Sequence, residues 1–202
     1  MANIHYVRQS HATGFADAIM LAKTFTGDDP FAILLGDDII YTPNGVRPGI
    51  GQLVDCFEET GNPTVAVMEV PDADIPKYAN IKGESIGKNR YAIEKIVEKP
   101  AVKDKFSNRA VIGRYVVDSD IYDVIRSTPP SRSGEVYFTD ALGLLAKQNR
   151  LVGCVFEGKR YDAGNKQEYL EANIEYALRS KELGDSMRSY ILNLSKTLEA
   201  KK

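Results

Sequence analysis

The sequence is poor in the residues from which several common kinds of site are built. It has two cysteines, Cys56 and Cys154, and two histidines among 202 residues. The cysteines stand apart in apolar surroundings, without the short spacing of a metal motif, so we expect two reduced core thiols rather than a disulfide or a metal site. The histidines, His5 and His11, also lack ligand spacing, and we expect no catalytic role for them.

Long apolar stretches and an excess of one charge are missing as well. No apolar run approaches the ~20 residues that span a bilayer, and the N-terminus has no basic-then-apolar signal pattern. The formal net charge is −2, which does not indicate a nucleic-acid partner. We therefore expect a cytoplasmic protein with neither a membrane nor a nucleic-acid partner, in which a local site binds any charged substrate.

The composition is that of a globular protein, with 43% hydrophobic and 27% charged residues, and the length suits one sizeable α/β domain. Three segments near the start predict a βαβ unit: a strand at 3–9, a helix at 14–25, and a strand at 31–36 with apolar residues on both faces. Such a unit implies a parallel sheet.

Further segments continue the alternation of strands and helices. Residues 1–183 are expected to form one domain, followed by an amphipathic helical tail at 184–202. The expected elements are helices at 49–61, 135–148 and 166–183, strands at 63–70 and 151–158, an antiparallel pair within 78–97, and a strand, a turn and a helix start across 108–125.

The apolar stretch "FAILLGDDII" stops at Gly36 and two carboxylates. In open parallel sheets, ligands bind beyond the carboxyl ends of the strands, which places Asp37 at that rim. A carboxylate there suits Mg²⁺, whereas Asp38 is interpreted as a turn residue on the other side. A simple Asp-rich turn explains Asp37 equally well from its spacing alone.

A second acid in a similar place would complete a metal site. "RYDAG" puts Asp162 after the predicted strand at 151–158 and before a glycine turn and a helix. Taken alone, Asp162 is as well explained as an N-cap of that helix. Taken with Asp37, it suggests a bipartite metal site bridged by phosphate oxygens.

The pentapeptide "IVEKP" offers two more polar groups at a strand end, because Pro100 stops the strand after Glu98 and Lys99. A lysine is a mobile point charge suited to phosphate, and a glutamate accepts hydrogen bonds from sugar hydroxyls. A solvated ion pair explains the two residues equally well.

Six segments, taken in order, resemble the sugar-nucleotide pyrophosphorylase superfamily, and within it the bacterial UTP–glucose-1-phosphate uridylyltransferases. The resemblance runs from about Ile4 to about Leu183. It implies an α/β fold of the Rossmann-like nucleotide-diphospho-sugar transferase type, with a mixed central sheet flanked by helices. The segments are "HYVRQ", "GDDPFAILLGDDI", "IVEKP", "SNRAVIGRYV", "GEVYFTDAL" and "GKRYDAGNKQEYLEA".

The resemblance implies a reaction in which glucose 1-phosphate attacks the α-phosphorus of UTP in line, giving UDP-glucose and pyrophosphate. The protein then supplies position and charge neutralisation rather than a nucleophile. By the match, Asp37 and Asp162 hold Mg²⁺ between the phosphates, and Lys99 binds the sugar phosphate. Asp37 and Lys99 are thus the expected catalytic residues.

The same resemblance assigns the substrate-binding residues. Glu98 and Glu135 bind hexose hydroxyls, and Gly113 permits the backbone to approach the sugar. Gln9 and Gly14 contact the nucleobase, Gln9 through its amide. A homo-oligomer is also expected.

The sequence departs from the family pattern in its first part. The family opens with a glycine-rich G-x-G-T-R loop and a P-K-x-x-L-P segment, and neither is among the 202 residues. The chain begins where the family's third or fourth strand would lie, so the fold is expected to be N-terminally incomplete. Backbone N–H groups of such a loop hold a triphosphate, and we therefore expect weak or no turnover by this chain alone.

Smaller departures lie near the expected nucleotide and sugar sites. Ala16 and Asp17 replace a glycine and a histidine, Ala79 replaces a glycine, and Tyr137 replaces a glutamine. The first pair suggests a changed base preference, and a methyl group at Ala79 could crowd the sugar.

Two further functions have to be weighed against this one. The chain could be a non-catalytic homologue that binds a sugar phosphate, or a subunit completed by a partner chain, because missing strands leave an unpaired sheet edge. A Rossmann-type dehydrogenase is disfavoured, since no G-x-G-x-x-G follows a predicted strand.

Overall fold

The computed structural model describes residues 2–131 and 134–199 and groups them into two compact units. Unit 1 comprises the described residues of Met1–Leu35 and Thr42–Gly158, and unit 2 those of Gly36–Tyr41 and Lys159–Lys202. The boundaries of these units differ from the boundary expected between a domain at 1–183 and a tail at 184–202. The expected domain and tail stay predictions. Residues 1, 132–133 and 200–202 of those two ranges lie outside the described residues.

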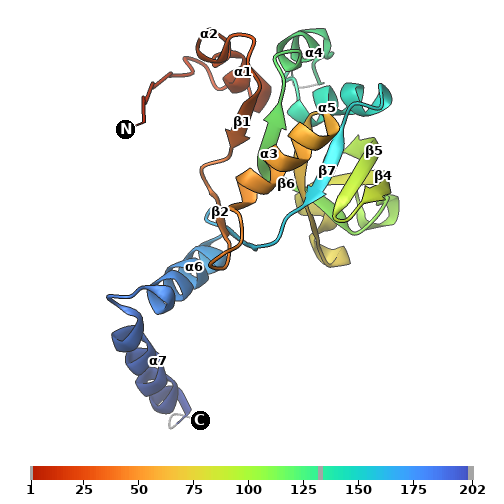
Figure 1. Cartoon of the computed structure of the whole chain (residues 1–202). Helices are drawn as coiled ribbons and strands as arrows, with labels where there is room; N and C mark the ends of the chain where they lie inside the picture. Colours follow the sequence, from red (N-terminus) through yellow and green to blue (C-terminus); the bar gives the residue numbers. More distant parts are fainter. Residues whose placement is uncertain (1, 132–133, 200–202) are drawn as a thin grey trace. The chain divides into compact units, whose positions relative to one another are not determined.

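Unit 1 is built on a six-stranded mixed sheet, which confirms the predicted α/β fold with a mixed central sheet (Figure 1). The strand order is β1-β6-β3-β7-β5-β4, with an additional pairing of β4 with β6. Among the described pairings, β3 with β7 is parallel and the others are antiparallel. The strands are β1 (Phe31–Leu34), β3 (Thr64–Glu69), β4 (Ala79–Gly87), β5 (Arg90–Val97), β6 (Arg109–Val117) and β7 (Val152–Val155).

Of the helices of unit 1, α1, α4 and α5 contribute buried residues to one hydrophobic core. In α5, five residues between Phe138 and Ala146 are buried at helical spacing, and α3 buries Leu53 and Cys56 and ends at the left-handed Gly61. The helices are α1 (Phe15–Met20), α2 (Lys23–Thr26), α3 (Gly49–Thr60), α4 (Ile121–Ser127) and α5 (Phe138–Lys147), with 3-10 turns η1 (Asp72–Lys77) and η2 (Val102–Asp104).

The predicted βαβ unit at the start of the chain is wrong. Residues 3–9 form no strand, and Ile4 and Tyr6 are 69% and 92% exposed. β1 is an edge strand that pairs antiparallel with β6, and its residues alternate between half-buried and exposed (Figure 1). A short apolar sequence can form either a covered central strand or an edge strand, so periodicity alone did not distinguish the two. The predicted helix at 14–25 is divided into α1 and α2.

Several boundaries also differ from the prediction. α5 begins at Phe138, so Glu135 lies in the loop before the helix rather than within it. The helix predicted at 166–183 ends at Arg179, where Ser180 adopts an extended backbone conformation. Two short strands around the expected metal ligands were not predicted.

Unit 2 consists of those two strands and two helices. β2 (Asp38–Tyr41) pairs antiparallel with β8 (Lys159–Asp162), with Asp38 opposite Asp162. α6 (Lys166–Arg179) is followed by α7 (Gly184–Glu199). The side chain of Asn165 caps α6 by accepting hydrogen bonds from the backbone N–H groups of Gln167 and Glu168.

Glu175 of α6 makes three polar contacts, two of which join the helix to β8. It forms an ion pair with Lys159, accepts a hydrogen bond of 2.6 Å from the Tyr161 hydroxyl and pairs with Arg179. The bond from Lys159, followed by that from Tyr161, lowers the pKa of the Glu175 carboxyl to about 2.

This depressed pKa makes the stability of unit 2 sensitive to acid. Because the folded-state pKa lies below the unfolded one, the stabilisation is complete above about pH 5 and is lost as the pH falls toward 2. We expect the free energy of unfolding, measured by urea denaturation, to fall more steeply across this range in the wild type than in Glu175→Gln. Glu182→Gln, at an exposed position, should follow the wild type; equal slopes for Glu175→Gln and the wild type would contradict the assignment.

The cysteines are both free and buried, as predicted. A hydrogen bond between the two thiols lowers the pKa of Cys56 to about 7, while the same bond and burial raise the pKa of Cys154.

In the described residues, no helix is both long and apolar enough for a membrane span.

Candidate functional site

The two predicted metal ligands lie together in unit 2. Asp37 is in the turn before β2, and Asp162 is the last residue of the neighbouring strand β8. Both carboxylates approach Gly164: a Cβ atom there would lie 3.0 Å from Asp162 Oδ1 and 3.5 Å from Asp37 Oδ2. The backbone N–H of Ala163 donates to the Asp37 carbonyl at 2.7 Å, which ties the two turns together.

Carboxylate oxygens such as those of this pair are of the ligand type that a magnesium ion takes. Mg²⁺ is usually held by one or two carboxylates, and substrate phosphates and water complete its coordination. The Asp37 side chain is exposed and has no hydrogen bond or ion pair within the described residues. Asp162 Oδ1 accepts the Gly164 N–H at 2.9 Å. No group of three or more acidic, histidine or cysteine side chains that could hold a metal ion occurs in 2–131 and 134–199.

Asp38 is not the turn residue that was predicted. It is the first residue of β2, is 4% exposed, and accepts a hydrogen bond of 2.5 Å from Arg160 Nε. The guanidinium of Arg160 also lies 3.3 Å from Asp162 Oδ2. Arg160 therefore joins a buried acid to a candidate metal ligand.

In unit 1, Glu98 and Lys99 follow β5 directly, as predicted. Glu98 accepts a hydrogen bond of 2.5 Å from the Thr139 hydroxyl at the start of α5. The Lys99 ammonium is 3.9 Å from Glu98 Oε1, and the Lys99 side chain is 61% exposed. Its backbone has φ 42 and donates to the Tyr78 carbonyl at 3.1 Å. Lys99 is thus held at its backbone while its ammonium group can still take an anion.

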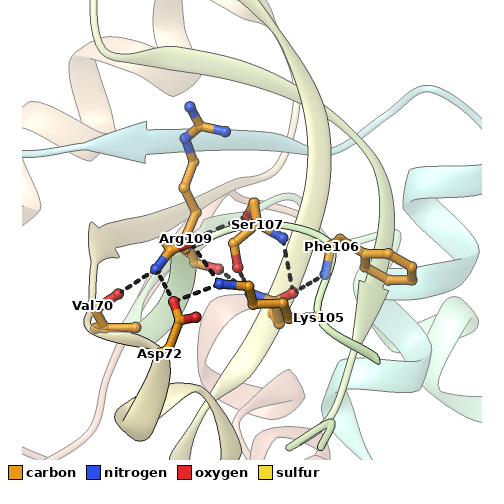
Figure 2. Close-up of polar contacts among 8 residues, drawn as sticks. Val70, Asp72, Lys105, Phe106, Ser107 and Arg109 are labelled. Carbon is orange, nitrogen blue, oxygen red and sulfur yellow. Dashed lines mark hydrogen bonds and ion pairs between the residues drawn. The ribbon is translucent and has the colours of Figure 1, made fainter. Parts of the chain in front are cut away.

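A polar network fixes the segment that connects Lys99 to β6 (Figure 2). The buried Asn80 side chain accepts from the Phe106 N–H at 2.7 Å and donates to the carbonyls of Ser107 and Arg109 at 2.9 and 2.8 Å. Lys105 pairs with Asp72, and the Ser107 hydroxyl donates to the Ile81 carbonyl. These bonds anchor the connection at its β6 end.

Gly113, the predicted sugar-facing glycine, lies buried in β6. Its carbonyl accepts the Leu35 N–H at 2.9 Å and a bond of 2.8 Å from the Arg114 guanidinium. Ala79 of β4 is 8% exposed and pairs with Val111 of β6, so its methyl group is part of the core.

Gln9, Gly14 and Glu135 are brought together in unit 1. The Gln9 amide nitrogen donates to the Gly14 carbonyl at 3.1 Å and to Asp17 Oδ2 at 2.8 Å. Thr13 also donates to Asp17 at 2.6 Å, and the two bonds lower the pKa of that carboxyl, the one from Thr13 the more. The Glu135 side chain lies against the bare Cα of Gly14.

Gly14→Ala should disturb this arrangement, because a Cβ there would lie 2.4 Å from Glu135 Oε1 and the backbone has φ 106. We expect a loss of about 1–2 kcal/mol in the free energy of unfolding by urea titration. Gly87→Ala is the matched control, since a Cβ at that position meets no atom within 4 Å. Equal stability of the two variants would contradict the close packing.

Three residues of the site were missed from the sequence. Arg160 stands two positions before Asp162, a spacing that puts both on one face of a strand, but β8 itself was not predicted. Thr139 and Asn80 act through bonds to residues far along the chain, and no local pattern marks them.

Comparison with known proteins places these segments in a family. Residues 1–179 match the family of nucleotidyl transferases. A UTP–glucose-1-phosphate uridylyltransferase 2 of Streptococcus pyogenes serotype M3 is 40% identical over 99% of this chain and 68% of its own length. The chain therefore spans about two thirds of the length of such relatives.

Two solved structures are similar to this chain in both fold and sequence. A UDP-glucose pyrophosphorylase complexed with UDP-glucose has a TM-score of 0.82 and 35% identity, covering 87% of this chain and 66% of its own. A UTP-bound UGPase from Acinetobacter baumannii has a TM-score of 0.83 and 29% identity, covering 93% and 65%. The resemblance found in the sequence is confirmed: the chain belongs to the nucleotidyl transferase family and, within it, to the UTP–glucose-1-phosphate uridylyltransferases.

Proposed function

We propose that this site serves uridylyl transfer between UTP and glucose 1-phosphate, with UDP-glucose and pyrophosphate as products. The observation that supports it most is the approach of the Asp37 and Asp162 carboxylates to one point beside Gly164, in a chain of this family. When bound there, Mg²⁺ would neutralise phosphate charge and polarise the α-phosphorus.

The side chains of unit 1 have matching tasks in this proposal. Lys99 neutralises the sugar phosphate, and Glu98, oriented by Thr139, accepts hydrogen bonds from hexose hydroxyls. Glu135 binds hydroxyls too, Gly113 lies close to the sugar, and Gln9 and Gly14 contact the nucleobase. Positioning of this kind lowers the barrier without a covalent intermediate.

The setting of the protein is part of the same proposal. Nucleoside triphosphates and sugar phosphates are metabolites of the cytoplasm, and we place the protein there. We also propose a homo-oligomer, because α6 and α7 carry large apolar side chains on their surfaces. These are Tyr169, Leu170, Ile174, Tyr190, Leu192, Leu194 and Leu198. Size-exclusion chromatography should give an assembly larger than 22.4 kDa; a strictly monomeric protein would contradict it.

A second candidate function is binding without turnover. It concerns the 202-residue polypeptide as such, in which no G-x-G-T-R sequence occurs. Backbone N–H groups of such a loop are the usual means of holding a triphosphate. In this case the 202-residue polypeptide would bind glucose 1-phosphate and UDP-glucose but release little pyrophosphate from UTP.

Calorimetric titration of the 202-residue polypeptide with glucose 1-phosphate, UDP-glucose and UTP in Mg²⁺ tests both candidates. We expect Lys99→Met to weaken glucose 1-phosphate binding by about tenfold, because a charge-assisted contact is lost. Lys103→Met, an exposed lysine of η2, is the matched control. Binding of glucose 1-phosphate and UDP-glucose without UTP turnover supports the second candidate, and turnover supports the first. No binding of any of the three ligands would overturn both.

A further inference from the structure

Unit 1 contains a cavity of about 710 Å³ that none of the proposed roles uses. It lies where α5 packs on β5 and is closed at the side by Phe106 and by the segment 128–131. Most of its surface is apolar, and Ile96, Pro129 and Leu144 contribute to it. We call it the α5–β5 groove. Its volume lies in the range of about 300–1,000 Å³ that is usual for small-molecule sites.

The groove has a definite direction along the two elements. Glu98 bonds to Thr139 at one end, and a Cβ at Gly143 would touch Ile96 Cγ2 at 3.6 Å. Two residues along a strand and four residues along a helix both cover about 6 Å. The strand residues Glu98 and Ile96 therefore lie opposite the helix residues Thr139 and Gly143. The next step leads to Lys147, which lines the opposite end.

Charges are distributed unequally between the two ends. The end near Glu98 is acidic, because Asp140 also lines it. The other end carries Lys147, whose ammonium group forms no ion pair within the described residues, whereas the Glu94 carboxylate is paired with Lys82 at 2.7 Å. An anion is therefore favoured at the lysine end and disfavoured at the other.

We propose that the α5–β5 groove binds a small amphiphilic acid and that binding of this ligand regulates the sugar site. The apolar body of the ligand lies along Ile96 and Leu144, and its single anionic group lies beside Lys147. Such a ligand buries apolar surface and pairs with the Lys147 ammonium group, which has no ion-pair partner within the described residues.

The regulatory part rests on the proposed function and on two hydrogen bonds. Ser131, which lines the groove, donates its backbone N–H to the Glu135 carbonyl at 2.8 Å. Val97 and Asp140, which also line it, are the chain neighbours of Glu98 and of its partner Thr139. A ligand that moves either wall thus moves a residue that is proposed to bind the hexose.

The binding part is tested with 8-anilinonaphthalene-1-sulfonate, which has an apolar body and one anionic group, by fluorescence titration of the folded chain. Gly143→Leu fills the groove, and its Cβ meets only Ile96 within 4 Å. We expect this variant, and also Lys147→Glu, to bind the probe at least about fivefold more weakly than the wild type. Lys103→Glu is the matched control and should bind like the wild type.

Circular dichroism at the titration temperature checks that each variant is folded, and Lys147→Glu at an exposed position keeps the test available if Gly143→Leu does not fold. Equal probe affinity in the wild type and Lys147→Glu would overturn the site.

The regulatory part is tested by calorimetry of glucose 1-phosphate binding with and without saturating probe. A change in affinity of at least about threefold that disappears in Lys147→Glu supports it. An unchanged affinity overturns the regulation while the proposed function stands. Absence of glucose 1-phosphate binding overturns the proposed function and with it the regulation, while the fluorescence result on the groove stands by itself.

Discussion

Asp162→Asn is expected to weaken the Mg²⁺-dependent binding of UDP-glucose by about tenfold to a hundredfold. Asparagine keeps the shape of the side chain and can still accept the Gly164 N–H, which Asp162 Oδ1 accepts at 2.9 Å. What it removes is one of the two negative charges beside Gly164 that would face the proposed cation, and an amide oxygen is a weaker ligand for Mg²⁺ than a carboxylate. Asp37→Asn should give a loss of similar size.

The measurement is a calorimetric titration with UDP-glucose in Mg²⁺ and again after removal of the metal by EDTA. The wild type without metal should resemble the two variants with metal, because each lacks the same interaction. Asp104→Asn, at an exposed position of η2, is the matched control and should retain the wild-type affinity. If Asp162→Asn bound as tightly as the wild type in Mg²⁺, the shared-ion site would be refuted.

Arg160→Met is expected to lower the free energy of unfolding of unit 2 by about 3–5 kcal/mol. The side chains of Arg160 and Asp38 are 9% and 3% exposed, so the variant deprives a buried carboxylate of its guanidinium partner. The cost is mainly that of keeping a carboxylate buried without the guanidinium rather than the intrinsic strength of the pair. Asp162 loses its contact with the guanidinium as well, although the exposed fraction of its side chain, 28%, leaves it partly hydrated.

Urea denaturation followed by circular dichroism of the helices measures this effect. The double variant Asp38→Leu/Arg160→Met should recover a large part of the loss, because neither charge is then buried. Arg188→Met, at an exposed position of α7, should change stability by less than about 0.5 kcal/mol. A double variant no more stable than Arg160→Met would show that the loss has another origin.

The sequence was sufficient for the fold class and for most helices and central strands. α3 could be predicted to end at Gly61 because a glycine is favoured at its left-handed conformation, φ 64. The prediction of a strand at 3–9 from alternating apolar and polar residues failed, because this segment has no partner strand in the described structure. Local periodicity indicates whether a segment can form a strand, whereas hydrogen bonding to another segment decides whether it does.

The candidate site was predicted in part for a similar reason. Asp37 and Asp162 were identified from residue type and from the family pattern, and the structure brings their side chains to Gly164. Asp38 was misjudged, because its burial depends on Arg160, which is 122 positions away. Contacts of such long range leave no periodic signal in one sequence.

That separation has a consequence for the order in which the protein is made. Asp37 leaves the ribosome long before the strand that pairs with β2, since the ladder joins Asp38–Tyr41 to Lys159–Asp162. Closing so large a loop costs entropy before any contact repays it, and such pairings form slowly. The growing polypeptide therefore cannot bring its two aspartates together until Asp162 has been translated, and nascent chains halted earlier should lack the candidate cation site.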